Sequence, residues 1–227
     1  MARIIFNDVS VTYGDVGVLS HITTEITEQR VAVIGANGGG KSTLVRLING
    51  LSEATSGEVL VDGRNVAREA KAVRKKVGFV FSDAENQIVM PTVREDIAFS
   101  LRRFKLSKEE KQHKVEQTME RFGLSKLADN SPHTLSGGQK QLLALASVLV
   151  IDPDVVIADE PTTLLDFRNR ELIREVFASL SQQLIVVTHD LDFITDFDRA
   201  LCVDNHRIAA DGAPTDVIRY YMEETRP

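Results

Sequence analysis

The chain has 227 residues, of which 43% are hydrophobic and 26% are charged, a composition typical of a soluble protein with one large core. No apolar run approaches the roughly 20 residues that a membrane span requires, and the polar opening stretch is unlike a signal peptide. The formal net charge of −6 argues against a protein that coats nucleic acid. The single cysteine, Cys202, lies in an apolar run, and we expect a small buried thiol in a reducing compartment.

The first third of the chain is expected to be rich in strands, because short apolar or alternating segments are separated by turn residues. In chain order the expected elements are antiparallel strands within residues 1–30, a buried strand at Val31–Ile34, a helix at Ser42–Asn49, a hairpin that turns at Asp62-Gly63 after Glu58–Val61, and a buried strand at Val77–Phe81.

From Val93 onward the apolar residues follow the period of a helix, which predicts a mostly helical insert over Val93–Asn130. The remaining expected elements are a helix at Gln139–Val150, a strand at Val155–Ala158, a helix at Arg168–Leu180, a strand at Leu184–Val187, a hairpin from Leu201–Val203 to Ile208–Ala210, and a short C-terminal helix. Strands that alternate with helices predict a single α/β domain over residues 1–227 with a mainly parallel sheet covered on both faces. An antiparallel β subdomain is expected near the N-terminus, and a helical subdomain around residues 83–150.

A glycine-rich segment lies between the first expected buried strand and the helix that follows it. Residues 35–43 read GANGGGKST and fit the pattern G-x-x-x-x-G-K-[ST] in a strand–loop–helix context. Such a loop points successive backbone N–H groups at phosphate oxygens beside a helix N-terminus. Lys41 would reach the β- and γ-phosphates, and the Ser42 hydroxyl would ligate Mg²⁺. The residues predicted to contact the nucleotide here are Gly35, Asn37, Gly38, Gly39, Gly40, Lys41, Ser42 and Thr43.

Two acids end the strand expected at 155–158, and buried strands rarely end in paired carboxylates without a role. We predict that Asp159 helps to hold Mg²⁺ and that Glu160 polarises the water that attacks the γ-phosphate. Two acids that simply face solvent are the alternative, which the phosphate loop disfavours. His189 follows the strand expected at 184–187, and on the residues alone it is either a hydrogen-bonded turn residue or a part of the same site.

Residues 135–139 read LSGGQ and open the helix expected at 139–150. Ser136 and Gln139 fit a capping box, but capping does not require Gly137 and Gly138 between them, so we predict a second anion site at these four residues. The five residues match the signature of ATP-binding-cassette (ABC) ATPases, and the chain resembles that family along its full length. The resemblance implies an ABC-type nucleotide-binding domain that binds and hydrolyses ATP with Mg²⁺.

The resemblance also implies roles for residues that their local pattern leaves open. Tyr13 corresponds to the aromatic residue that stacks on adenine, although an ordinary hairpin aromatic is an equal reading of the residues alone. Thr163-Leu-Leu-Asp166 corresponds to the D-loop, and His189 to the switch residue that contacts the γ-phosphate. In this family the signature completes the nucleotide site of a second copy, which implies an ATP-dependent homodimer.

One position departs from the family pattern. Ser82 stands where the family usually has a glutamine that senses Mg²⁺ and the attacking water. A serine can still contact Mg²⁺ through water, but it lacks the amide, which puts the coupling between the site and the helical insert in doubt. Asn86 and Gln87 lie further along the same loop, and either could compensate.

Three stretches, Val77–Phe81, Asn86–Phe99 and Asp159–Asp166, resemble the ATPase subunit of energy-coupling-factor vitamin importers. Within that group, the dedicated biotin system is most similar in the uninterrupted helix Leu142–Val150, in residues 163–166 with Arg168-Asn169, and in the short C-terminus. This resemblance implies a peripheral protein on the cytoplasmic face of the cell membrane, with a transmembrane coupling protein, a vitamin-capturing membrane protein and no nucleic acid as partners. Cobalt or nickel uptake and a non-transport cytosolic ABC ATPase are the alternatives. An apolar groove between the Ser82–Pro91 loop and the helical insert is expected to dock the coupling protein, with Met90 as an anchor.

Overall fold

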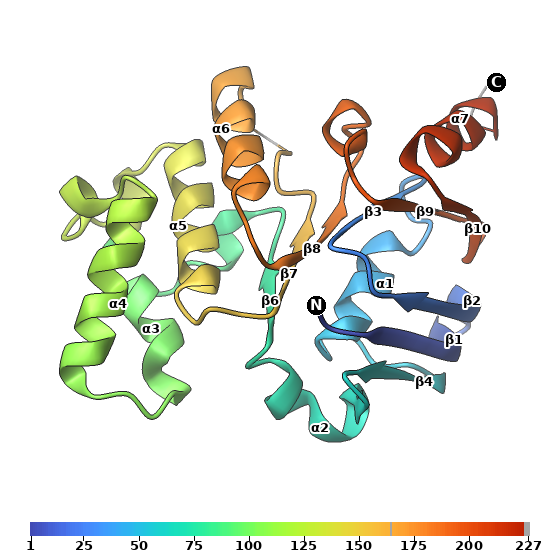
Figure 1. The fold of residues 1–227 in the computed structure, drawn as a ribbon, viewed down its shortest axis with the longest axis horizontal. Coiled ribbons are helices and arrows are strands. Elements are labelled where there is room, and N and C mark those ends of the chain that lie inside the picture. The colour runs from blue at the N-terminus through green and yellow to red at the C-terminus, as the bar shows by residue number, and fades with distance from the viewer. Residues whose placement is uncertain (164, 225–227) are drawn as a thin grey trace.

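A computed structural model describes residues 1–163 and 165–224 and contains two sheets surrounded by helices (Figure 1). The larger sheet has six strands in the order β10-β9-β3-β8-β7-β6, and only β10 runs antiparallel to its neighbour. Its strands are β3 (Arg30–Ile34), β6 (Val77–Val80), β7 (Val155–Asp159), β8 (Gln183–Val187), β9 (Arg199–Asp204) and β10 (Arg207–Gly212). All residues of β6, β7 and β8 are buried, as expected for parallel strands covered on both faces.

The smaller sheet is antiparallel, with the order β2-β1-β4-β5. Its strands are β1 (Ile4–Tyr13), β2 (Val16–Ile26), β4 (Ser56–Val61) and β5 (Arg64–Asn65). The hairpin between β4 and β5 turns at Asp62-Gly63, with positive φ angles of 51° and 75°, as a two-residue turn that follows the twist of the strands requires. Ile4 and Phe6 of β1 share one buried cluster with Leu44 of α1 and Val33 of β3, so this sheet packs against the phosphate-loop helix.

The helices are α1 (Lys41–Ile48), α2 (Val66–Val73), α3 (Val93–Ser100), α4 (Lys108–Arg121), α5 (Gly137–Leu149), α6 (Phe167–Ala178) and α7 (Pro214–Glu224). Figure 1 shows α3, α4 and α5 gathered on one side of β6–β8, with α1 and the antiparallel strands on the other. Helix α2 was not expected from the sequence. It begins after Asn65, whose side chain accepts from the backbone N–H of Arg68, and it buries only Val66 and Val73, too little to produce an apolar period.

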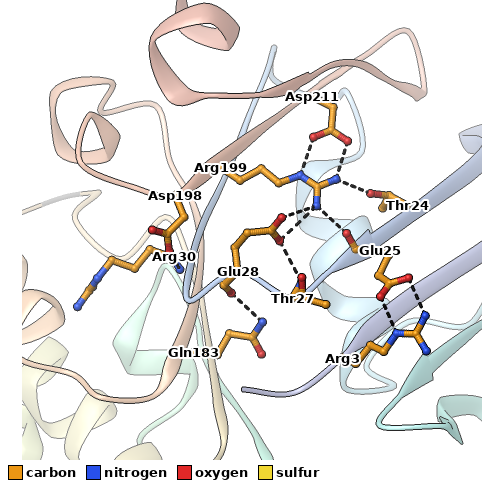
Figure 2. Close-up of polar contacts among 10 residues, drawn as sticks. All are labelled: Arg3, Thr24, Glu25, Thr27, Glu28, Arg30, Gln183, Asp198, Arg199 and Asp211. Atoms are coloured by element: carbon orange, nitrogen blue, oxygen red, sulfur yellow. Dashed lines mark hydrogen bonds and ion pairs between the residues drawn. The ribbon is translucent and has the colours of Figure 1, made fainter.

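Arg199 of β9 joins the two sheets in a polar cluster (Figure 2). Its guanidinium donates to both carboxylate oxygens of Asp211 at 2.6 and 2.7 Å, to Glu28 at 3.1 Å and to the Thr24 hydroxyl of β2 at 3.0 Å. These bonds and the neighbouring charges raise the pKa of Arg199, chiefly through the hydrogen bonds with Asp211, although burial acts the other way. The strand β2 is therefore fixed to β9 and β10 by charge-assisted bonds in a partly buried place.

Candidate nucleotide-binding site

The predicted site residues follow three strands that are adjacent in the central sheet. Residues 35–43 follow β3, Asp159 and Glu160 end and follow β7, and His189 comes shortly after β8. Because parallel strands present their carboxyl ends at one edge of a sheet, the fold gathers these residues at that edge, where open α/β sheets bind ligands. The phosphate-loop context read from the sequence, strand then loop then helix, is confirmed.

The glycines of the phosphate loop are required for two different reasons. A Cβ on Gly35 would lie 2.0 Å from the backbone oxygen of Val203, and one on Gly40 would lie 2.7 Å from that of Val18, so the backbone passes too close to its neighbours for a side chain. Gly38 has open space around it but a φ of 78°, in the left-handed region that other residues rarely adopt. The loop therefore keeps a backbone shape that substituted residues would not hold.

Lys41 is buried and its ammonium donates to the carbonyl oxygens of Gly35 and Ala36, each at 2.9 Å. Burial lowers the pKa of Lys41, while the charges of Glu160 and Asp159 act in the opposite direction. The loop thus curls around the lysine. Within the described part of the chain no side chain caps the N-terminus of α1, so its first N–H groups are available to an anion.

Asp159 is 2% exposed, and both of its oxygens have partners on α1. The Ser42 hydroxyl donates to Oδ1 at 2.8 Å, and Arg46, one turn further along, donates to Oδ2 at 3.1 Å. A hydroxyl and a carboxylate in direct contact are oxygen donors of the kind that Mg²⁺ uses together with nucleotide phosphates. The pair Ser42 and Asp159 therefore fits this ion.

Glu160 adopts a φ of 53°, unusual for a residue with a side chain, and its N–H donates to the carbonyl of Val187. Its Oε2 accepts from the Thr163 hydroxyl at 3.2 Å, and its Oε1 lies 3.0 Å from Nε2 of His189. Although close to the imidazole, Oε1 accepts no well-aligned hydrogen bond from any described residue. Glu160, Thr163 and His189 line a cavity of about 470 Å³, although Oε1 itself is buried against the imidazole. The sequence alone did not decide whether His189 is a turn residue or a part of the site, and the structure places it beside Glu160.

The signature residues form the first turn of α5, which begins two residues earlier than expected. Both bonds of the capping box are present: Ser136 Oγ accepts from the N–H of Gln139 at 3.3 Å, and Gln139 Oε1 accepts from the N–H of Ser136 at 2.9 Å. A Cβ on Gly137 would meet nothing within 4 Å, whereas one on Gly138 would lie 2.2 Å from Oδ1 of Asn169. Among the described residues no hydrogen bond joins residues 136–139 to the phosphate loop of the same chain.

Tyr13 ends β1, is 54% exposed, and places its hydroxyl 3.4 Å from Oγ of Ser52. The ring is open enough to accept a planar ligand, and its role toward adenine stays a prediction. The D-loop expected at 163–166 is described except for Leu164, which lies outside the described residues. Its Asp166 forms the N-cap of α6.

The loop after β6 contains Ser82, at the position of the missing glutamine, and the two amide residues Asn86 and Gln87. Ser82 is half-buried just beyond the end of β6. Gln87 accepts from the N–H of Phe81 at 3.1 Å and donates to the carbonyl of Ala144 at 3.2 Å, so it ties the end of β6 to α5. Asn86 donates to Asp83 within its own loop. Both amides therefore have partners other than Ser42 and Asp159.

Sequence reasoning missed Asp96, a buried acid on α3. Its Oδ1 accepts from the N–H groups of Val89 and Met90 at 2.8 and 3.1 Å, and its Oδ2 accepts from the Ser147 hydroxyl of α5 at 3.0 Å. Asp96 lies on the same face of α3 as the buried apolar residues of that helix, so the helical period could have predicted its burial. It holds the loop of residues 82–91 against α5.

A groove of about 540 Å³ runs beside this loop, with Val89 64% exposed and Met90 half-buried at its edge. The groove was expected between the loop and the insert of Val93–Asn130. Its opposite wall is instead formed by Pro132, His133 and Lys140, which precede and open α5. An ion pair between Lys140 and Glu85 spans the groove.

A phosphate loop, paired acids at the end of a buried strand, and a signature turn on a separate helix define an ABC-type ATPase. The sequence profile described as ABC transporter matches residues 19–163. A protein of Bartonella henselae with the general name of an ABC transporter ATP-binding protein is 50% identical over 98% of both chains. The biotin transport ATP-binding protein BioM of Rhizobium etli is 46% identical over 96% of this chain and 97% of its own.

Among solved structures, CbiO1 of Clostridium perfringens, described as part of the ABC transporter complex CbiONQ, superposes with a TM-score of 0.84. It is 31% identical, and the match covers 97% of this chain and 92% of that one. The chain belongs to the ABC transporter family. It is the ATP-binding subunit, an ATP hydrolase that drives transport, as the resemblance had implied. No helix within residues 1–163 and 165–224 is long and apolar enough to cross a membrane.

Proposed function

We propose that this chain is the ATPase subunit of an energy-coupling-factor importer and that the imported vitamin is biotin. The observation that supports the transported substrate is the 46% identity, over nearly the full length of both chains, to a relative named for biotin transport. A relative from Methanothermobacter thermautotrophicus named as an energy-coupling factor ATP-binding protein is 38% identical over 84% of this chain and 64% of its own. An importer of cobalt or nickel is the second candidate.

In the proposed reaction, Lys41 leaves its carbonyl partners and binds the β- and γ-phosphates, which the N–H groups of residues 35–43 surround. Ser42 and Asp159 would hold Mg²⁺, which would supply positive charge to the phosphates. Glu160 accepts a hydrogen bond from the attacking water through its carboxylate, and His189 contacts the γ-phosphate from the same cavity. Tyr13 would stack on adenine, and Ser82 would contact the ion through water.

The active unit is an ATP-dependent homodimer of single ABC ATPase domains, residues 1–227, each with a helical subdomain over about 83–150. The residues of the signature, Ser136 to Gln139, make no hydrogen bond to the phosphate loop of their own chain within the described residues, which supports a role on the nucleotide of a second copy. The groove beside Met90 receives a helix of the transmembrane coupling protein. A separate membrane protein captures biotin, the complex lies at the cytoplasmic face of the membrane, and nucleic acid is not a partner.

The test is uptake of labelled substrate into membrane vesicles that contain the purified complex in a known orientation. We expect ATP-dependent uptake of biotin. Uptake of cobalt or nickel instead would refute biotin and leave the transport motor standing, whereas copurification from native membranes without any integral membrane protein would favour a cytosolic ATPase. Met90→Asp should place a charge at the groove edge and break copurification, while nucleotide binding is retained; the matched control is Met222→Asp, on an exposed side chain of α7.

A further inference from the structure

The two glycines of the signature occupy different surroundings, although the sequence presents them as a pair. Gly137 is exposed, and an added Cβ would meet nothing within 4 Å. Gly138 is buried, and an added Cβ would lie 2.2 Å from Oδ1, 2.3 Å from Cγ and 2.8 Å from Nδ2 of Asn169. The whole amide group of one side chain therefore fills the space that a side chain at 138 would need.

Asn169 belongs to the first turn of α6, the helix that follows the D-loop. Its backbone N–H donates to Oδ1 of Asp166, the N-cap of that helix, at 2.8 Å. Its half-buried side chain lies over the first turn of α5, and Figure 1 shows the two helices side by side. One residue thus contacts the D-loop through its backbone and the signature turn through its amide.

We propose that Asn169 is a positioning residue that keeps the D-loop and the signature turn in register, and that Gly138 is a glycine because the Asn169 amide lies on it. Register matters because both segments belong to the surface that, under the proposed function, meets the second copy. A misplaced signature turn would hold its Ser136 hydroxyl and N–H groups at the wrong distance from the phosphates bound by the second copy. Hydrogen bonds weaken steeply as their distance and angle depart from the optimum.

The test is a double-mutant cycle, which isolates the interaction of two residues from their separate effects. Gly138→Ala, Asn169→Ala and the double variant are made in a Glu160→Gln background, and the ATP-dependent dimer is measured by analytical ultracentrifugation. We expect Gly138→Ala to raise the dimer dissociation constant by roughly tenfold or more, and Asn169→Ala, which loosens the register, to raise it by about threefold. The double variant should return to the level of Asn169→Ala, because removing the amide makes room for the methyl group. Gly137→Ala is the matched control for the contact with Asn169. Adding Asn169→Ala should change the dimer dissociation constant of Gly137→Ala only by the factor that Asn169→Ala causes alone.

The proposal is overturned if the double variant dimerises as poorly as Gly138→Ala, because the bare backbone at 138 would then serve the phosphate itself. It is also overturned if Gly138→Ala dimerises normally. Thermal unfolding without nucleotide tests the packing separately: Gly138→Ala should unfold at lower temperature and Asn169→Ala should restore it. Rescue of unfolding without rescue of the dimer would reduce Asn169 to a structural contact. If Glu160→Gln itself stays monomeric with ATP, the proposed homodimer fails, and unfolding alone decides on the contact.

Discussion

Replacing Asp96 with alanine should destabilise the protein by about 3 kcal/mol. The carboxylate is 4% exposed and accepts three hydrogen bonds, from two backbone N–H groups and the buried Ser147 hydroxyl. Hydrogen bonds to charged groups are worth about 1.5–3 kcal/mol each, but the sum overstates the loss because burial of the carboxylate opposes folding. The N–H of exposed Val89 can also return to water. A net loss of about 3 kcal/mol corresponds to a fall in Tm of roughly 6–12 °C for a domain of this size.

Urea unfolding followed by far-UV circular dichroism measures this loss directly. Asp129→Ala is the control, because that side chain is 87% exposed and its contact with Arg94 is long, at 3.4 Å. Ser147→Ala should lose about 1 kcal/mol, and it should add little to Asp96→Ala because the two share one bond. Amide exchange at Val89 and Met90 should accelerate in Asp96→Ala alone. A loss below about 1 kcal/mol with unchanged exchange would refute the reasoning that Asp96 holds the loop.

Four further outcomes are expected. Glu160→Gln should lower turnover by roughly two orders of magnitude or more while ATP still binds, because the amide is a poor base; rapid turnover in single-cycle assays would exclude Glu160 as the group that orients water. Lys41→Ala should abolish hydrolysis and weaken binding of labelled ATP, and normal binding would contradict its contact with the phosphates. Ser82→Ala should be mild and Ser82→Gln should alter the ATPase rate, whereas collapse of activity in the alanine variant would make the serine a working ligand. Cys202, buried with its pKa raised to about 11, should resist iodoacetamide at pH 8 until the chain unfolds, and rapid labelling of the native protein would contradict its burial.

Local patterns were sufficient to predict most elements and the phosphate loop. The strand at 31–34 and the loop that follows it are determined by residues close together in the sequence, so their patterns can be recognised without knowledge of the rest of the fold. Helix α2 was not predicted because its only buried residues are two valines at its ends, which produce no helical period. The contact of Gln87 was left open and that of Asp96 was missed for another reason: each residue has one partner on α5, more than fifty positions along the chain, and only the folded arrangement brings them together.

The capping box at the signature has a consequence for how the hydroxyl of Ser136 can be used. A hydroxyl group accepts through its lone pairs and donates through a single O–H, and the cap occupies only the accepting side. The donor is therefore left over for a phosphate oxygen, so the helix start need not loosen when the nucleotide of another subunit arrives. Aspartate at this position would cap the helix equally well yet carry a negative charge toward the same oxygens. Under the proposed function, folding and nucleotide recognition would therefore use opposite ends of one hydroxyl group, and a single substitution would remove the second while sparing the first.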